Sequence, residues 1–385
     1  MTTIERGQQH IMNTYGRFPI VLEKGEGLYI WDENGKKYLD FVAGIAVNTL
    51  GHGNKKLSGA IAEQASKMIH VSNLYWTKPA ISLAEKLTAN SGFDKVFFCN
   101  SGAEAVEGAL KIARKYSPER HEIIAMKDSF HGRTYGAITA TGQEKYQQGL
   151  KPLLPGIVHV PFNDFDALKA AVNDKTCAVL MEPIQGEGGI RPADREYLKN
   201  VRSLCDKAGI LLMFDEIQCG TGRTGYLFAA EYYGVAPDVT ALAKGMAGGV
   251  PIGVLLATEK VASAFKPGDH ASTFGGNPLA TAAANVVMDE LLNGGLLENV
   301  KKQGAYLTSK LHALKDKHSA ILDVRGVGLM QGIELNTPVA PIIGSCIEKG
   351  LLLVNAGPNI IRFVPPLTVT QQDIDTCMDI LDKVL

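Results

Sequence analysis

The 385-residue sequence lacks closely spaced cysteines, a net charge and long apolar runs, and each absence excludes a class of protein. Its six cysteines are never closer than 14 residues, so it holds neither a CxxC pair nor a zinc-knuckle spacing. The formal charge of −1, from 39 basic and 40 acidic residues, offers no electrostatic footprint for nucleic acid or an anionic membrane. No apolar run approaches the ~18 residues of a membrane helix. We therefore expect binding to neither nucleic acid nor membrane.

The N-terminal 18 residues also lack the apolar core of a signal peptide, and they carry Glu5, Arg6 and His10. Several cysteines lie inside apolar stretches, which is typical of reduced, buried thiols in a cytosolic protein. We therefore expect a cytoplasmic location. Glycine, in contrast, is abundant: the 41 residues exceed the usual ~7% and are expected at turns where the backbone approaches something closely.

Between about residues 95 and 265, short apolar runs alternate with longer segments of helical periodicity. Strands separated by helices are typical of βαβ units, so we predict an α/β core with a mostly parallel sheet of about seven strands, buried on both faces. The expected strands are Val96–Cys99, Ile123–Met126, Ile157–Val160, Cys177–Met181, Ile210–Phe214, Val239–Ala243 and Ile252–Ala257.

The two ends of the chain have a different pattern. Residues 20–40 predict a β-hairpin that turns at Glu33–Gly35. After residue 280, long helical patterns precede strand-like pieces, and a capping-box-like start at Thr370 opens the last helix. We expect the two ends to form one smaller α+β domain. The predicted division is an N-terminal segment 1–45, a large domain 46–278 and a C-terminal part 279–385, with late strands at Leu329–Glu334, Leu351–Val354 and Ile360–Val364.

Polar residues follow five of the predicted strands at the point where each strand ends. They are Asn100–Gly102, Ser129–Arg133, Glu182, Asp215–Glu216 and Lys244. Open α/β sheets bind ligands at the carboxyl ends of their strands. Five such segments at one edge therefore predict a functional site.

Three of these segments suggest particular chemistry. Ser101–Ala103 leads into a helix, where backbone N–H groups and a hydroxyl could bind an anion; a plain serine cap is the alternative. Lys244, between an apolar strand and a glycine-rich turn, would lose hydration and become a usable nucleophile, unless it is a solvated surface charge. Asp215 ends a very apolar strand, so it needs either an ion-pair partner or a ligand's protonated ring nitrogen.

One further segment, Gly220–Gly225, matches the G-x-G-x-x-G pattern of dinucleotide-binding proteins and suggests an NAD-dependent dehydrogenase. Its context argues against that function. The acidic residue expected about 20 positions later is missing, and the following Tyr226-Leu-Phe does not begin with helix-forming residues.

Six segments in order and spacing resemble the class III (ω-amino acid) aminotransferases that depend on pyridoxal 5′-phosphate. This resemblance implies the fold-type I architecture, with a large domain around a seven-stranded, mostly parallel sheet and a smaller α+β domain. It also implies a homodimer with shared active sites. The segments are Asn100–Glu104, Phe130–Thr134, Glu182–Gly189, Asp215–Gly225, Lys244–Gly253 and Ser272–Pro278.

The resemblance implies a role for each cofactor-binding residue. Lys244 would form the Schiff base and move a proton between the substrate carbon and the cofactor. Asp215 would keep the pyridine nitrogen protonated, which makes the ring an electron sink. The other implied contacts are Ser101, Gly102 and Ala103 at the phosphate, helped by Thr273 of the partner subunit, Gln218 at the phenolic oxygen, and Phe130 and Ile217 on the two ring faces.

The resemblance also implies how substrates are held. Arg133 would clamp a substrate carboxylate through its guanidinium fork, near Ser272. Glu187 would pair with Arg362 and release it for the α-carboxylate of glutamate; a purely structural ion pair is the alternative. Glu182 would lie beside the ring, and no metal site is expected.

Within the family, Gly44–His52 and Ser272–Asn277 are most similar to members that act on N2-acetyl-L-ornithine. This similarity implies transfer of its δ-amino group to 2-oxoglutarate, a step of arginine biosynthesis. The alternatives are an ω-aminotransferase for ornithine, succinylornithine or 4-aminobutyrate, and a cofactor-binding protein without turnover. The cofactor-binding segments are shared by all these aminotransferases and do not separate them.

Overall fold

A seven-stranded sheet forms the centre of the computed structural model, which describes all 385 residues. The strand order is β4-β12-β11-β10-β7-β5-β6, and only β12 runs antiparallel to its neighbours. The predicted α/β core and its mostly parallel sheet are therefore confirmed. The strands are β4 (Lys95–Cys99), β5 (Glu122–Met126), β6 (Ile157–Val160), β7 (Thr176–Met181), β10 (Leu211–Asp215), β11 (Val239–Leu242) and β12 (Gly253–Ala257).

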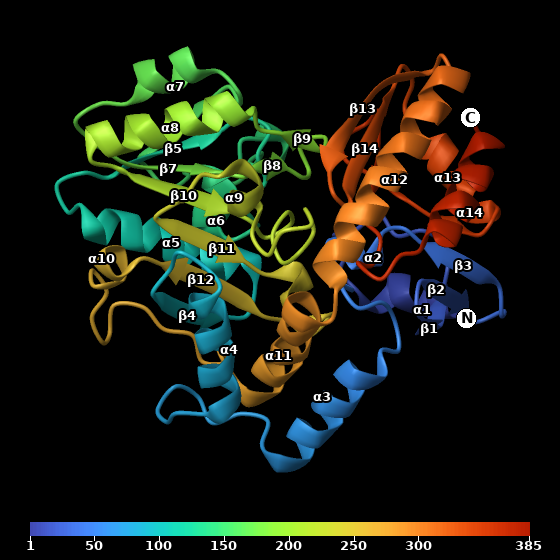
Figure 1. Ribbon diagram of the computed structural model, residues 1–385, viewed down its shortest axis with the longest axis horizontal. Helices are drawn as coiled ribbons and strands as arrows, with labels where there is room; N and C mark the ends of the chain where they lie inside the picture. The colour runs from blue at the N-terminus through green and yellow to red at the C-terminus, as the bar shows by residue number, and fades with distance from the viewer.

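Helices cover both faces of this sheet (Figure 1). On β10, Leu212 and Phe214 pack into the apolar cluster that contains α8, whereas Leu211 and Met213 pack into the cluster that contains α5. Every residue of β10 is buried, as expected for a strand covered on both sides. The helices around the sheet are α5 (Gly102–Tyr116), α6 (Tyr135–Ala140), α7 (Phe165–Ala171), α8 (Arg195–Ala208), α9 (Ala229–Tyr233) and α10 (Glu259–Ala262).

The two ends of the chain meet in a second, smaller unit that holds both termini (Figure 1). The expected hairpin is present as β2 (Tyr29–Asp32) and β3 (Lys37–Asp40), extended by β1 (Leu22–Glu26). Strand β3 pairs in parallel with β15 (Leu351–Leu352), so residues about 310 positions apart share a sheet.

A second sheet in this unit carries β17 (Ile360–Phe363), with the order β13-β14-β17-β16. The predicted strand Leu351–Val354 is wrong as one element. It divides at Leu353, because β15 pairs with β3 whereas β16 pairs with β17. The remaining elements are β13 (Ile321–Val327), β14 (Met330–Leu335), β16 (Val354–Asn355), α12 (Leu296–Lys317), α13 (Ala340–Glu348) and α14 (Gln371–Asp382), which opens with the expected Thr370–Asp373 capping box.

Helix α11 (Pro278–Asn293) connects the two units and packs against α3 and α4. No helix is both long and apolar enough to cross a bilayer. The other elements are α1 (Thr3–His10), α2 (Ala43–Ala46), α3 (Lys55–Lys67), α4 (Lys78–Ala89), β8 (Ile184–Gln185), β9 (Arg191–Pro192) and the 3₁₀ turns η1 (Glu144–Tyr146) and η2 (Lys244–Ala247).

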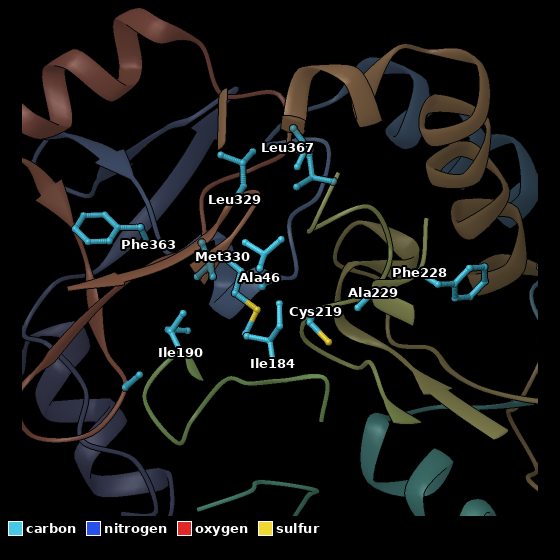
Figure 2. Close-up of a cluster of buried hydrophobic side chains, with 14 of the residues drawn as sticks. Ala46, Ile184, Ile190, Cys219, Phe228, Ala229, Leu329, Met330, Phe363 and Leu367 are labelled. Carbon is cyan, nitrogen blue, oxygen red and sulfur yellow. The ribbon is translucent and has the colours of Figure 1, made fainter. Parts of the chain in front are cut away.

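Apolar side chains fill the space where the smaller unit meets the sheet. Figure 2 shows Ile184 and Cys219 from the sheet side near Met330 and Leu329 from the C-terminal part, all buried in one cluster. This packing places β17 beside the carboxyl edge of the central sheet. Because the cluster is continuous across the junction, the division at residues 45 and 278 stays a prediction.

Candidate active site

A cavity of about 360 Å³ opens at the carboxyl edge of the sheet, where the sequence predicted a site. Ten of the fourteen candidate residues line it. They lie at or just after the carboxyl ends of β4, β5, β7, β10 and β11, except Glu187, which follows β8. The lining candidates are Ser101, Gly102, Ala103, Phe130, Glu182, Glu187, Asp215, Ile217, Gln218 and Lys244.

Lys244 begins the 3₁₀ turn η2, two residues after β11 ends at Leu242, with a left-handed φ of 40°. Burial lowers the pKa of Lys244, and the Arg362 charge acts in the same direction. The opposing charges of Glu187 and Glu182 reduce this effect without cancelling it. A larger share of neutral amine makes this lysine a better nucleophile than one in solvent.

Asp215 is held by a buried histidine, which the sequence had left without a role. His131 Nδ1 lies 2.7 Å from Asp215 Oδ2, and both side chains are almost fully buried. Burial alone would lower the pKa of His131, but the hydrogen bond and charge of Asp215 raise it above its usual value. The second carboxylate oxygen accepts the Ile217 N–H at 3.0 Å. These two contacts fix the orientation of the Asp215 carboxylate at the cavity wall.

Glu182 ties two cavity loops together. Its two carboxylate oxygens accept the N–H groups of Phe130 and Gly186, each at 2.9 Å. Burial, together with the Asp215 charge, raises the pKa of Glu182 to about 7, against the opposing charge of His131. This carboxyl group therefore titrates near neutral pH while it holds the backbone that carries Phe130.

The N-terminus of α5 forms a cradle for an anion. The Ser101 side chain caps the helix by accepting the Glu104 N–H, so Ser101 is a helix cap, as the simpler interpretation predicted. The N–H groups of Gly102 and Ala103, however, make no hydrogen bond within the chain, and both residues line the cavity. A Cβ on Gly102 would lie 2.7 Å from the Ile217 side chain, so any larger residue there would displace a side chain that lines the cavity. Free N–H donors at the positive end of a 15-residue helix suit a phosphate group.

On the opposite wall, Glu187 forms an ion pair with Arg362 from β17. The Arg362 Nη1 also donates to Gln218 Oε1 at 2.9 Å, and Nη2 donates to the Asn355 carbonyl at 3.2 Å. Burial would raise the pKa of Glu187, but the charges of Arg362 and Lys244 hold it below its usual value. Gln218 therefore connects the ion pair to the centre of the cavity.

Four candidates do not line this cavity: Arg362, which contacts the lining residues Glu187 and Gln218, and three others. Arg133 follows the lining residue Gly132, but its guanidinium lies over the ring of Tyr146. Ser272 and Thr273 line a neighbouring hollow, where the Ser272 hydroxyl accepts from the Asn100 side-chain amide at 2.9 Å. Within a single chain, Thr273 does not line the cavity that holds the cradle at α5.

The comparisons with known proteins agree with this geometry. The pattern of the family described as aminotransferase class-III matches residues 11–385. The chain belongs to the class-III aminotransferases. It is 53% identical to the acetylornithine aminotransferase of Caldanaerobacter subterraneus subsp. tengcongensis, over 100% of this chain and 99% of the relative.

Solved structures of class-III aminotransferases resemble the whole chain. The N-acetylornithine aminotransferase of Stenotrophomonas maltophilia is 37% identical with a TM-score of 0.84, over 99% of this chain and 98% of that one. The ornithine aminotransferase of Toxoplasma gondii, whose structure shows partial occupancy of pyridoxal phosphate in its active site, is 32% identical. Its TM-score is 0.95, over 99% of this chain and 93% of that one. The fold-type I architecture implied by the sequence is thus confirmed.

In this class-III aminotransferase the Gly220–Gly225 segment serves packing and not dinucleotide binding. It lies between β10 and α9 without forming a strand-to-helix turn. A Cβ on Gly222 would overlap Leu291, and the buried Arg223 donates to the carbonyls of Leu329 and Pro365. The glycines therefore let this loop pack against the C-terminal part of the chain.

Two residues near the site were missed from the sequence. His131 stood within the segment after β5 but had no assigned partner, because its pairing with Asp215 spans 84 positions. Tyr146 carried no signal at all, since a tyrosine in a polar stretch is ordinary. Only the folded chain brings each of them to its partner.

Proposed function

We propose that this aminotransferase moves the δ-amino group of N2-acetyl-L-ornithine to 2-oxoglutarate, giving N-acetyl-L-glutamate 5-semialdehyde and L-glutamate. The observation that carries this function is the similarity over the full length to acetylornithine aminotransferases at 50–53% identity. The reaction is a step of arginine biosynthesis, and its substrates are an amino acid and a 2-oxo acid.

The cofactor of the family is pyridoxal 5′-phosphate, and the residues at the cavity fit it. The free N–H groups at α5 match a phosphate, and the buried Asp215 carboxylate matches a protonated ring nitrogen. When bound, this cofactor supplies an electron sink for the bond that breaks at the substrate carbon.

We assign the chain's own residues to this chemistry as follows. Lys244 would bind the cofactor covalently and carry the proton to and from the substrate carbon, for which its lowered pKa suits it. Asp215, held by His131, would keep the ring nitrogen protonated. Phe130 and Ile217 would pack on the two ring faces, and Gln218 Nε2, whose nearest acceptor within the chain is 3.4 Å away, would donate to the ring oxygen.

Two arginines would separate the two substrates. Arg133 would bind the single carboxylate of N2-acetyl-L-ornithine, while Glu187 keeps Arg362 neutralised. L-glutamate carries a second carboxylate that could displace Glu187 and reach Arg362. The exposed part of the Glu187 side chain, 24%, supports this exchange, because the carboxylate has solvent to move into.

A homodimer is part of the proposal. Leu74, Tyr75 and Trp76 are 81%, 71% and 91% exposed in the single chain, an apolar stretch that a second copy would cover. The same loop region contacts the segment of Ser272, since Asn73 donates to the Ser272 carbonyl at 3.0 Å. Thr273 would thereby reach the phosphate cradle of the partner subunit. A cytoplasmic location is also proposed, and the six free, buried cysteines support it.

The test is a half-reaction on the purified yellow protein without any oxo acid. Rapid bleaching by N2-acetyl-L-ornithine, and slow bleaching by ornithine, succinylornithine and 4-aminobutyrate, is the expected result. Faster bleaching by one of the other amines would agree with the same mechanism but show that this amine is the substrate. A protein that stays colourless after incubation with pyridoxal phosphate would refute the cofactor assignment as a whole.

A further inference from the structure

The two arginines of the site are held in different ways. Arg362 is neutralised by a carboxylate, Glu187. None of the chain's ion pairs involves Arg133, and its guanidinium carbon lies 4.2 Å from the centre of the Tyr146 ring. It lies 5.6 Å from the centre of the Phe130 ring, which lines the cavity.

This difference matters for binding a carboxylate. A guanidinium that stacks on an aromatic ring uses its face and keeps the N–H donors in its plane free. An acidic partner would occupy those donors and would have to be displaced. An arginine that binds both substrates is therefore better held by an aromatic ring, which leaves its N–H donors free, than by a carboxylate side chain.

Tyr146 is itself fixed from the backbone. It ends the 3₁₀ turn η1, and the next residue, Gln147, donates its side-chain amide to the carbonyls of Ile138 at 3.1 Å and Thr141 at 2.9 Å. These carbonyls belong to the end of α6, whose first turn follows Arg133. The Tyr146 ring also meets Phe130 edge-on, at 5.6 Å and 78°. The backbone next to Tyr146 is thus anchored without Arg133, and the ring itself contacts Phe130, Lys145 and Arg133.

We propose that Tyr146 is a positioning residue. It would hold Arg133 in the orientation that binds one carboxylate of each substrate. This inference rests on the proposed function, because it takes Arg133 as the group that binds that carboxylate. Tyr146 would then set the affinity for carboxylate-bearing substrates in both half-reactions, whereas Arg362 affects only the half-reaction with glutamate.

The experiment compares Tyr146→Leu with Tyr146→Phe in the cofactor-loaded enzyme. Loss of the ring is expected to raise KM for N2-acetyl-L-ornithine and L-glutamate by about 2- to 30-fold, the range of cation–π strengths, with kcat nearly unchanged. Tyr146→Phe keeps the ring and should restore KM. Glutarate, which has no amine or oxo group, should bind more weakly to Tyr146→Leu by the same factor, measured by calorimetry.

Two control variants separate the explanations. Tyr232→Leu removes an Arg–Tyr stack of the same 4.2 Å, with Arg195, away from the cavity, and should leave KM unchanged. Arg133→Gln tests the clamp itself. If Arg133→Gln raises KM and Tyr146→Leu does not, only the inference on Tyr146 fails. If Arg133→Gln leaves KM unchanged, the proposed role of Arg133 fails and the inference fails with it.

The remaining outcomes are also decisive. A fall in kcat without a change in KM or in glutarate affinity would overturn the inference. It would show that Tyr146 acts through its contact with Phe130 and not through Arg133. Should the leucine variant fail to fold, Tyr146→Met removes the ring with a longer side chain, and glutarate affinity again decides.

Discussion

Neutralising Glu187 is expected to change which substrate the enzyme favours. In the structure Arg362 is 1% exposed, and Glu187 is the carboxylate that neutralises it. The variant Glu187→Gln keeps the size and one acceptor oxygen but removes the charge. Arg362 then has only neutral acceptors, namely the amide oxygen at position 187 and the oxygens of Gln218 and Asn355.

The expected change in the KM for L-glutamate can be worked out from the energy of the Glu187–Arg362 ion pair. Opposite charges about 4 Å apart attract by roughly 4 kcal/mol at an effective dielectric constant of 20, and leaving one charge of a buried pair unpaired costs about 3–5 kcal/mol. Because the Glu187 side chain is 24% exposed, solvent reduces the difference. We expect about 1.4–3 kcal/mol, or roughly 10- to 150-fold. L-glutamate no longer has to displace an anion, so its KM should fall by this factor.

The half-reaction with N2-acetyl-L-ornithine should change in the opposite direction. Its carboxylate gains a second binding place at the freed Arg362, where the acetylated α-nitrogen cannot react. Its half-reaction should therefore slow and show inhibition at high substrate concentration. Bleaching and recovery of the yellow colour in rapid mixing measure both half-reactions separately.

A matched control is available at the other edge of the sheet. Asp238→Asn neutralises a carboxylate that accepts from Arg202 at 2.9 Å, at the amino end of β11. It should leave the ratio of the two half-reactions unchanged. If Glu187→Gln also leaves that ratio unchanged, the ion pair is structural only and the reasoning on substrate exchange is refuted.

Four further changes test the rest of the site and the residues around it. Lys244→Ala should abolish turnover while the thermal unfolding temperature is kept; retained transamination would remove Lys244 from the chemistry. Asp215→Ala should slow the reaction by several orders of magnitude, and a drop of only a few-fold would mean that the cofactor is misplaced. His131→Asn should lower kcat by about 10- to 150-fold, the value of one charge-assisted hydrogen bond, and an unchanged kcat would show that Asp215 does not depend on it. Burial raises the pKa of Glu216 to about 7, so its contribution to stability is complete below about pH 4.5 and is lost as the pH rises to 7. Glu216→Gln should flatten the free energy of unfolding across that interval in denaturant titrations, and an unchanged slope would contradict it.

Much of the fold and the site could be predicted because the signals are local. The apolar composition of the strands predicts them, and the polar residues that follow Cys99, Met126, Met181 and Phe214 predict one edge of the sheet. The resemblance then supplies a role for each. The His131–Asp215 pair and the stack of Arg133 on Tyr146 could not be predicted, because they depend on the distance between side chains from different loops.

The short segment α2, which precedes α3, has a backbone conformation that local sequence patterns do not predict. Four successive residues, Ala43 to Ala46, have left-handed φ values of 50–65°, although only one of them is glycine. Each non-glycine residue there costs roughly 1–2 kcal/mol, and nothing in the sequence Val-Ala-Gly-Ile-Ala-Val signals it. The turn persists because hydrogen bonds hold both of its ends, local ones at its start and a tertiary one after it. Asp40 accepts the N–H groups of Val42 and Ala43, and Thr49 donates its hydroxyl to the Gly245 carbonyl at 2.7 Å.

The position of this strained turn explains why the chain tolerates its cost. The Gly245 carbonyl that Thr49 holds belongs to the residue after Lys244, whose own φ is left-handed. Val47, directly after the turn, lines the cavity. A relaxed right-handed helix at 43–46 would point the chain elsewhere and remove both the cavity wall and the support under Lys244. The backbone strain is therefore concentrated where the reactive amine must be placed, and the rest of the core supplies the stability that maintains it.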